Sequence, residues 1–518
     1  MFRPPGSRGA MSALARFRRM SHEFAGRCRG MLRRHWLFAA VAGCATVLRA
    51  VVQLAYQPAL IFPDSERYLE YAWRFAIGHW SPDSLRTSGY SLLLIPAVLT
   101  RNLAVVAAAQ HLLGLATAVP IYAVLVHFGA RRWLAALATV PVLFDPLQLD
   151  IEQYVLTDVS ATFLLVVALV VLVWKRNAIG KTAPAVAGLL LAAATIIRES
   201  DLLVMIPAVL YLLAVVRPRR RLTARTALLL AGFLPPVLGY LGWYQMSHGR
   251  FDFVSYDSQF MYGRVVQFAD CTGVSLPRYE RTLCPRQPPA QRNPDFYMWG
   301  RRSPLVTFEP PPGMSTGRIV TDFDRRIIEH QPLTYLKVVG DDILYSFSPV
   351  RGDGPEHYPT WYQQFHTYFP AQKDEVATLR ASTGRGPHVQ PALAGFLTGY
   401  GRDFHVPGPL LAVGLALGVA GMAGIGRARR SSLRAPCLLF TIGAVAAFAP
   451  PFVIVAFDWR YELPQLSLIP VAAVLGVMAL AGRAADRTTM WPTSANRLVR
   501  SGQRPNASQP VSNPSHGS

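Results

Sequence analysis

Charged and polar aromatic side chains follow long apolar runs at four places in this sequence. The first place is PDSERY, Pro63 to Tyr68, soon after the apolar stretch 35–56. A carboxylate there can take a proton as a general base, and a guanidinium can bind a phosphate through paired hydrogen bonds. The four places supply Asp64, Glu66, Arg67, Tyr68, Arg86 and Tyr90; Asp150, Glu152 and Asp158; Arg198, Glu199 and Asp201; and Asp458, Arg460 and Tyr461. If they converge, these side chains form a pocket for acid–base chemistry on a phosphate-bearing substrate.

Any one of these residues also has an ordinary explanation. A charge in a solvated loop, or an arginine whose stem lies along an apolar surface, needs no function. This alternative applies to each of them and to Arg49, which lies in the outer half of the first apolar run. A charged side chain in a bilayer costs about 2.5–3.5 kcal/mol on insertion scales, however, and those that persist usually mark a site. The joint pattern therefore favours a functional pocket.

The elements that position these residues are apolar enough to cross a bilayer. The chain is 51% hydrophobic and only 16% charged, whereas soluble proteins carry about 25% charged residues. A helical span needs about 20 apolar residues. We predict ten spans: 35–56, 102–129, 133–144, 158–174, 183–197, 201–216, 226–244, 406–425, 435–456 and 464–482. The sequence therefore predicts an all-α polytopic membrane protein.

The arginine clusters predict the orientation of these spans. Ten spans place the clusters RR, KR, RPRRR and GRARR, together with both tails, on one side, and the four polar places on the other. Basic loops stay in the cytoplasm, so we expect a plasma-membrane protein with cytoplasmic termini and an extracytoplasmic pocket. The net charge of +22 is then a property of the loops and does not indicate a nucleic-acid partner.

The predicted spans divide the chain into five parts. These are a cytoplasmic basic tail, 1–34; a seven-span catalytic core, 35–246, with a first outer loop at 57–101; an extracytoplasmic loop domain, 247–405; a three-span module, 406–482; and a disordered cytoplasmic tail, 483–518. Cys271 and Cys284 fall in the loop domain, where a disulfide can persist, and two free thiols are the alternative. The loop aromatics either contact an acceptor or form the loop's own core: Tyr256, Phe260, Trp299, Trp361 and Tyr362.

The four polar places also resemble segments of a known family, the GT-C glycosyltransferases. The similar segments are FPDSERYLEYA followed by RTSGYSLLLIPAVL, then FDPLQLDIEQYVLTDVSATFLLVVAL, LAAATIIRESDLLVMIP and DWRYELPQLSLIP. These polytopic enzymes use polyprenyl-phosphate sugars, and they include protein mannosyltransferases, aminoarabinose transferases and actinobacterial arabinosyl- and mannosyltransferases. The resemblance covers residues 35–245 and, more weakly, 455–482, but not the loop domain.

The resemblance implies roles for particular residues. Asp64 matches the family's catalytic acidic residue and Asp158 a second acidic position, while Arg198 and Arg460 match basic positions associated with the lipid-linked donor. The remaining expected binding residues are Arg49, Tyr68, Arg86, Tyr90, Glu199 and Tyr461. In protein mannosyltransferases an Asp-Glu pair stands where this chain has Asp64 and Ser65. A metal requirement does not carry over, and a Mg²⁺ or Mn²⁺ cofactor stays open.

Together these features predict an inverting glycosyltransferase with Asp64 as general base. It would move a single sugar, mannose or arabinofuranose, from a polyprenyl-phosphate donor to a hydroxyl of a glycan, protein, lipid or peptide natural product. Two alternatives are a transporter or lipid flippase, and a ligase or polymerase of surface glycans. Transporters often bind near the bilayer midplane between repeated halves, whereas here the charges lie at the ends of the spans.

Overall fold

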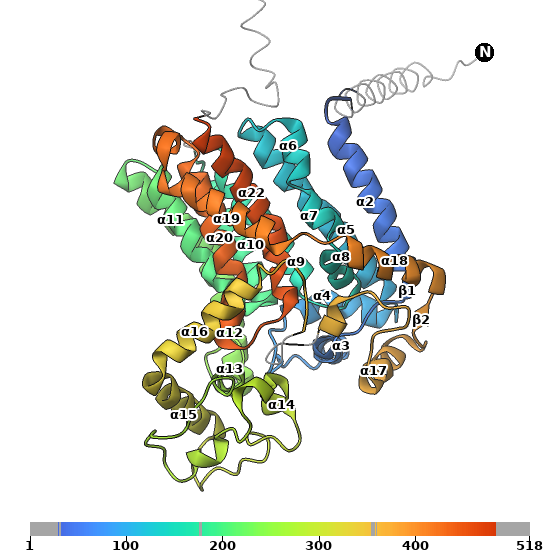
Figure 1. Ribbon diagram of the computed structural model, residues 1–518, viewed down its shortest axis with the longest axis vertical. Helices are drawn as coiled ribbons and strands as arrows, with labels where there is room; N and C mark the ends of the chain where they lie inside the picture. The colour runs from blue at the N-terminus through green and yellow to red at the C-terminus, as the bar shows by residue number, and fades with distance from the viewer. Residues whose placement is uncertain (1–29, 31–32, 176–178, 354–357, 359, 483–518) are drawn as a thin grey trace, which may run out of the picture.

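The regular structure of the protein is almost entirely helical (Figure 1). The computed structural model describes residues 30, 33–175, 179–353, 358 and 360–482. Within them the strands are β1 (Tyr56–Gln57) and β2 (His388–Val389), which pair antiparallel. Nearly all of the expected basic tail, 1–34, and all of the expected disordered tail, 483–518, lie outside the described residues. The expectation of an all-α chain is confirmed.

Five segments of the described chain are long and apolar enough to cross a bilayer. They are α2 (Trp36–Ala55), α5 (Ala104–His127), α12 (Arg219–His248), Arg434–Ile454, which holds α20 (Arg434–Phe448) and α21 (Pro450–Ile454), and Trp459–Leu480, which holds η6 (Trp459–Glu462) and α22 (Leu463–Leu480). The bent pair α18 (Pro391–Asp403) and α19 (Gly408–Ala423), at 54° to each other, adds a sixth if it crosses as one span. The chain is thus a membrane protein with five or six candidate spans.

The other expected spans form helices that are short or broken. Residues 133–144 are divided between α6 (Arg132–Leu137) and α7 (Val140–Phe144), and α11 (Met205–Val215) has 11 residues. α9 (Asp158–Val173) and α10 (Thr182–Ile197) have 16 residues each. Sixteen residues rise about 24 Å, less than the hydrocarbon thickness of about 30 Å. Helix length alone therefore does not give ten spans.

The helices of the bundle pack closely because small residues lie between them. A Cβ on Gly188 of α10 would lie 2.0 Å from the carbonyl oxygen of Leu229 on α12. A Cβ on Gly232 of α12 would in turn lie 2.1 Å from the carbonyl oxygen of Ala185. α9 and α22 are buried along most of their length. The ends of these helices therefore have fixed positions, and the polar residues at those ends are held with them.

The basic turns lie together at one end of the bundle. The Arg132 guanidinium donates to the carbonyl of Arg34 at 3.1 Å, where the described chain begins. The side chain of Arg427 in η5 (Gly426–Arg430) lies against Gly482, the last described residue. Its Cδ is 3.3 Å from the point that a Cβ on Gly482 would occupy. Helices α13 to α16 lie at the opposite end of the bundle (Figure 1). The described chain therefore begins and ends at the basic end, away from those helices.

The expected loop domain, 247–405, packs in two places. Its first part has its own core, formed by α13 (Asp257–Val265) and α15 (Thr316–His330) and closed by the Cys271–Cys284 disulfide. The disulfide expectation is confirmed, with a Cα–Cα distance of 6.3 Å. The second part, with α17 (Lys373–Thr383) and α18, packs with α3 (Pro63–Ala76) in the first outer loop. The remaining elements are α4 (Gly89–Leu99), α8 (Pro146–Gln153), α14 (Pro294–Trp299), α16 (Pro332–Tyr345), η1 (Glu199–Val204), η2 (Glu280–Leu283), η3 (Pro289–Gln291) and η4 (Thr360–Gln363).

Candidate active site

A cavity of about 760 Å³ lies where the first outer loop, the bundle and the loop domain meet. Eight of the ten residues expected to act in catalysis or binding line it: Asp64, Tyr68, Arg86, Asp158, Arg198, Glu199, Arg460 and Tyr461. They come from α3, the loop before α4, the start of α9, the end of α10, η1 and η6. The four polar places, up to 396 residues apart in the sequence, therefore converge on one hollow.

Asp64 lies in the first turn of α3, and the local sequence fixes that position. The hydroxyl of Ser65 accepts from the Phe62 N–H at 2.9 Å and donates to the Val155 carbonyl at 2.8 Å. Ser65 is buried, whereas Glu66 is exposed to solvent and does not line the cavity. The serine thus caps the helix and ties it to the bundle. Asp64 is left to line the cavity.

Two guanidinium groups bind the Asp64 carboxylate. Arg86 donates to Oδ1 at 2.7 Å, and Arg460 donates to Oδ2 at 2.9 Å. Burial raises the pKa of Asp64, but the charges of Arg86 and Arg460 have the larger combined effect and hold it below its usual range. Asp64 is therefore ionised, and it is a weaker base in this state than an unpaired aspartate.

Arg86 and Arg460 are themselves held by neighbouring groups. The hydroxyl of Thr87 donates to the Ile197 carbonyl at 2.8 Å, which fastens the Arg86 loop to the end of α10. Arg460 Nε lies 2.9 Å from Asp458 Oδ2. Arg351 adds a further tie, because it pairs with Asp145 at 2.8 Å and with Glu462 in η6 at 3.0 Å. The two cations are thus positioned before any ligand binds.

Arg198 supplies a third cation with hydrogen-bonding capacity left over. Its backbone is extended (φ −147°, ψ 107°), which ends α10 and starts η1. Its Nη1 lies 3.3 Å from Asp158 Oδ1, and the guanidinium stacks over the Tyr461 ring at 5.3 Å. Within the described residues, neither Nη1 nor Nη2 has a hydrogen-bond partner, although both are buried. Such N–H groups can donate to the oxygens of a phosphate.

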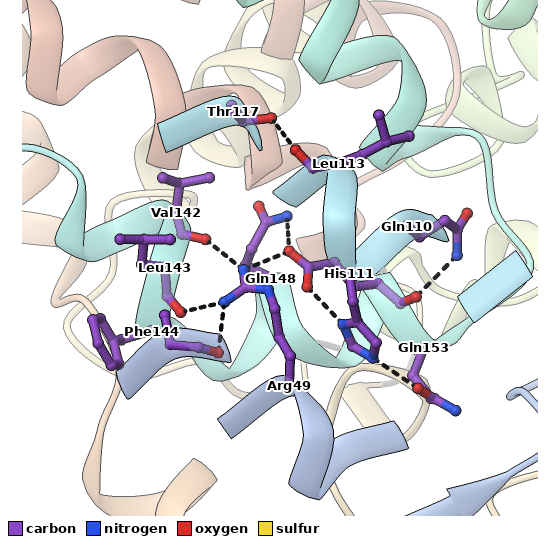
Figure 2. A network of polar contacts seen from close by, with 12 residues as sticks. Arg49, Gln110, His111, Leu113, Thr117, Val142, Leu143, Phe144, Gln148 and Gln153 are labelled. Atoms are coloured by element: carbon purple, nitrogen blue, oxygen red, sulfur yellow. Dashed lines mark hydrogen bonds and ion pairs between the residues drawn. The ribbon is translucent and has the colours of Figure 1, made fainter. Parts of the chain in front are cut away.

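Arg49 and Tyr90 do not line the cavity. Arg49 donates to Glu152 at 2.7 Å and to the Leu143 carbonyl at 2.8 Å, in a buried network that Figure 2 shows. The carbonyls at the end of the short α7 are free to accept from it, because a helix leaves its last carbonyls unpaired. The Tyr90 hydroxyl donates to Gln110 at 2.8 Å, and its ring packs edge-on behind Tyr68 at 5.2 Å. Tyr90 therefore supports the site from behind Tyr68, whereas Arg49 belongs to a separate buried network.

The loop domain contributes residues that we did not predict from the sequence. Those that matter here are Asp252, Ser258, Thr321, Asp324, Arg325 and Glu329. Of the five loop aromatics, only Phe260 lines the cavity. Its ring lies under the Arg86 guanidinium at 4.9 Å. Tyr362, by contrast, is buried and donates to Glu375. The signal available in the sequence was the amphipathic pattern of TDFDRRIIEH, which is also typical of an ordinary surface helix.

Within the described residues, no three His, Cys, Asp or Glu side chains are grouped to hold a metal ion. No family model, no curated protein and no solved structure matches this chain. The function is therefore argued from the chemistry of the cavity.

Proposed function

We propose that this protein is a GT-C-like glycosyltransferase that uses a polyprenyl-phosphate sugar. The observation that carries the proposal is the convergence of Arg86, Arg198 and Arg460 with Asp64 and Asp158 on one cavity. Three cations suit a phosphate. A lipid phosphate is already an adequate leaving group, so the protein needs only to stabilise it and to take a proton from the acceptor.

The apolar part of the cavity supports a lipid-linked donor. Leu202, Leu203 and Ile454 line the cavity and are 38%, 43% and 40% exposed on the surface of the protein. These side chains follow the Arg198 turn or belong to α21, next to the helices that form the bundle. Exposed leucine and isoleucine beside the spans of a membrane protein are suited to contact with lipid. A polyprenyl chain can then leave the cavity on this side while its phosphate stays with the arginines.

The proposed reaction is a single displacement. The acceptor oxygen bonds to the anomeric carbon, the bond from that carbon to the phosphate oxygen breaks, and the electron pair leaves on the lipid phosphate. The acceptor proton passes to Asp64. Because Arg86 and Arg460 bind Asp64 in the free protein, the donor phosphate must first compete for these guanidiniums. Asp64 then gains basicity only when the donor is bound, and attack on the face opposite the phosphate inverts the configuration.

The proposal places the site on the extracytoplasmic face of the plasma membrane. The basic turns lie at the end of the bundle opposite α13 to α16, as the positive-inside rule requires. The short helices α6–α7, α9, α10 and α11 then complete ten crossings, with both termini cytoplasmic. Mannose and arabinofuranose are the sugars proposed.

The test is transfer by the purified protein in lipid vesicles. Synthetic polyprenyl-phosphate mannose and polyprenyl-phosphate arabinofuranose are offered with acceptors, with and without EDTA to reveal a metal requirement. We expect one of the donors to be consumed and its sugar transferred with inversion. A flippase would move the donor across the vesicle and leave it intact, and a glycan ligase would require a preassembled glycan. Either result contradicts the proposal.

A further inference from the structure

Helix α15 has two faces with different roles. Ile319, Phe323 and Ile327 on one face are buried in the core of the loop domain, against α13. The residues that line the cavity lie on another face: Thr321, Asp324, Arg325, Ile328 and Glu329. Their offsets of three, four, seven and eight residues put them on one side of a helix. α15 is therefore held by its apolar face and forms a wall of the cavity with its polar face.

Asp324 is the unusual residue of this wall. It is 2% exposed, and within the described chain neither carboxylate oxygen has a hydrogen-bond partner. Other buried acids of the same domain do have a cation nearby: Asp342 lies 2.6 Å from Arg264, and Glu280 lies 3.4 Å from Arg326. Burial raises the pKa of Asp324 well above its usual value. A buried carboxyl group without a partner is costly, so its presence in a cavity wall points to a ligand that pairs with it.

The charges that line the cavity differ between its walls. The bundle and the first outer loop supply Arg86, Arg198 and Arg460, together with Glu199 and with Asp64 and Asp158, which pair with these arginines. The loop domain supplies the acids Asp252, Asp324 and Glu329. The loop domain's cation in this lining, Arg325, lies 3.3 Å from Asp322. An anionic phosphate is attracted to the arginines and repelled by the acids. A hydroxyl group, in contrast, donates readily to a carboxylate.

We propose that the polar face of α15 is the acceptor subsite, with Asp324 as an acceptor-binding residue. The acceptor it fits is a neutral polyol such as a sugar ring, one hydroxyl of which donates to Asp324. The carboxylates suit the hydroxyl groups, and Phe260 offers an aromatic surface to the apolar face of the ring. This inference rests on the proposed glycosyl transfer, and it concerns only which part of the cavity holds the acceptor.

The experiment compares Asp324→Asn with Asp341→Asn. Asp341 belongs to the same domain, but it is exposed and pairs with Lys337 on the surface of α16. Transfer from the donor that the wild type uses is measured against the concentration of short alkyl glycosides, with a Ser/Thr peptide as the alternative acceptor. Binding of polyprenyl phosphate and thermal unfolding are measured separately. Glu329→Gln is a second variant, on an exposed position of the same face.

We expect kcat/KM for the alkyl glycoside to fall about 10–100-fold in Asp324→Asn, the effect of losing a hydrogen bond to a charged group. Binding of polyprenyl phosphate should be unchanged. The melting temperature at neutral pH should stay equal or rise, because burial raises the pKa of the Asp324 carboxyl group and this group therefore costs stability there. Glu329→Gln should show a smaller fall in kcat/KM, and Asp341→Asn none.

Other outcomes overturn the subsite. An unchanged kcat/KM in Asp324→Asn contradicts it, and so does a loss of transfer that accompanies a lower melting temperature, since that indicates a structural role. A wild type that transfers only to the peptide contradicts the polyol assignment. A wild type that consumes neither donor refutes the proposed function itself, and the subsite with it. Wild-type donor consumption therefore separates failure of the function from failure of the subsite.

Discussion

Two clusters of arginine and carboxylate in this protein differ in what surrounds them. In the first, Glu152 accepts from Arg49, Gln148 and His111 (Figure 2). The side chains of Arg49 and Glu152 are 2% and 0% exposed. In the second, around Asp64, the cations are 10–21% exposed and line a cavity of about 760 Å³. Both look alike in the sequence, since each has charged residues within or just after an apolar run.

The comparison teaches that buried charge alone does not mark a site. The Glu152 carboxylate has partners for both of its oxygens. Arg49 Nε and Gln148 Oε1 have no hydrogen-bond partner among the described residues, but neither residue lines the cavity. Arg198 in the second cluster pairs with Asp158, but its two buried Nη nitrogens have no hydrogen-bond partner among the described residues. A site needs both space and hydrogen-bonding groups that are not yet used. Only the cluster around Asp64 has both.

The largest expected effect is on transfer in Asp64→Asn. This change keeps the size of the side chain but removes the base, and general-base catalysis contributes about 10²–10⁴-fold. Transfer per folded molecule should fall by that amount, measured with the donor that the wild type uses. Glu66→Gln is the matched control, because Glu66 is exposed and outside the cavity. Equal transfer rates for Asp64→Asn and the wild type would exclude Asp64 as the base.

The second-largest effect should be on the free energy of unfolding, in the cluster around Glu152, which we call the closed cluster. Glu152→Gln leaves Arg49 buried without its countercharge, which costs about 3–5 kcal/mol of unfolding free energy. Gly114→Ala should act in the same way, because its Cβ would lie 1.8 Å from Glu152 Oε1. Thermal unfolding measures both. A Glu152→Gln variant with normal stability but no transfer would make the closed cluster part of the site.

A smaller effect is expected on donor binding in Arg198→Lys. Lysine keeps the charge that faces Asp158 but loses the planar pair of donors. Affinity for polyprenyl phosphate should fall about 10-fold, near the lower end of the loss of a hydrogen bond to a charged group, with little change in stability. Arg67→Lys is the control, because Arg67 pairs with Asp83 and does not line the cavity. Unchanged affinity in Arg198→Lys would remove Arg198 from the phosphate site.

The sequence predicted the bundle side of the cavity better than the loop side. Polar residues such as Asp64 and Arg198 stand out because they follow apolar runs, where a charged side chain is costly and usually marks a site. Asp324 does not stand out, since an amphipathic helix in a polar loop is ordinary. The contacts of Arg49 were not predictable in the same way, because its partner carbonyls on α7 become available only where the expected span 133–144 breaks. That break is a tertiary feature, so the pattern of residues did not predict it.

The contribution of a carboxyl group to folding stability should change with pH in opposite directions at Asp64 and at Asp324. The arginines lower the pKa of Asp64 in the folded state, so its stabilising contribution is complete above the usual aspartate range and is lost as the pH falls through the folded pKa. The difference in melting temperature between the wild type and Asp64→Asn should therefore be present at pH 7, on the order of 2 °C, and shrink below about pH 4.

At Asp324 burial raises the pKa, so the folded protein binds the proton more tightly than the unfolded chain and loses stability as the pH rises. The gain in melting temperature of Asp324→Asn should then be near zero at about pH 4 and grow toward neutral pH. Melting curves of both variants across this range measure the two signs. The same sign for both would mean that Asp324 is paired as Asp64 is, and the difference between a carboxylate held by arginines and one awaiting a ligand would disappear.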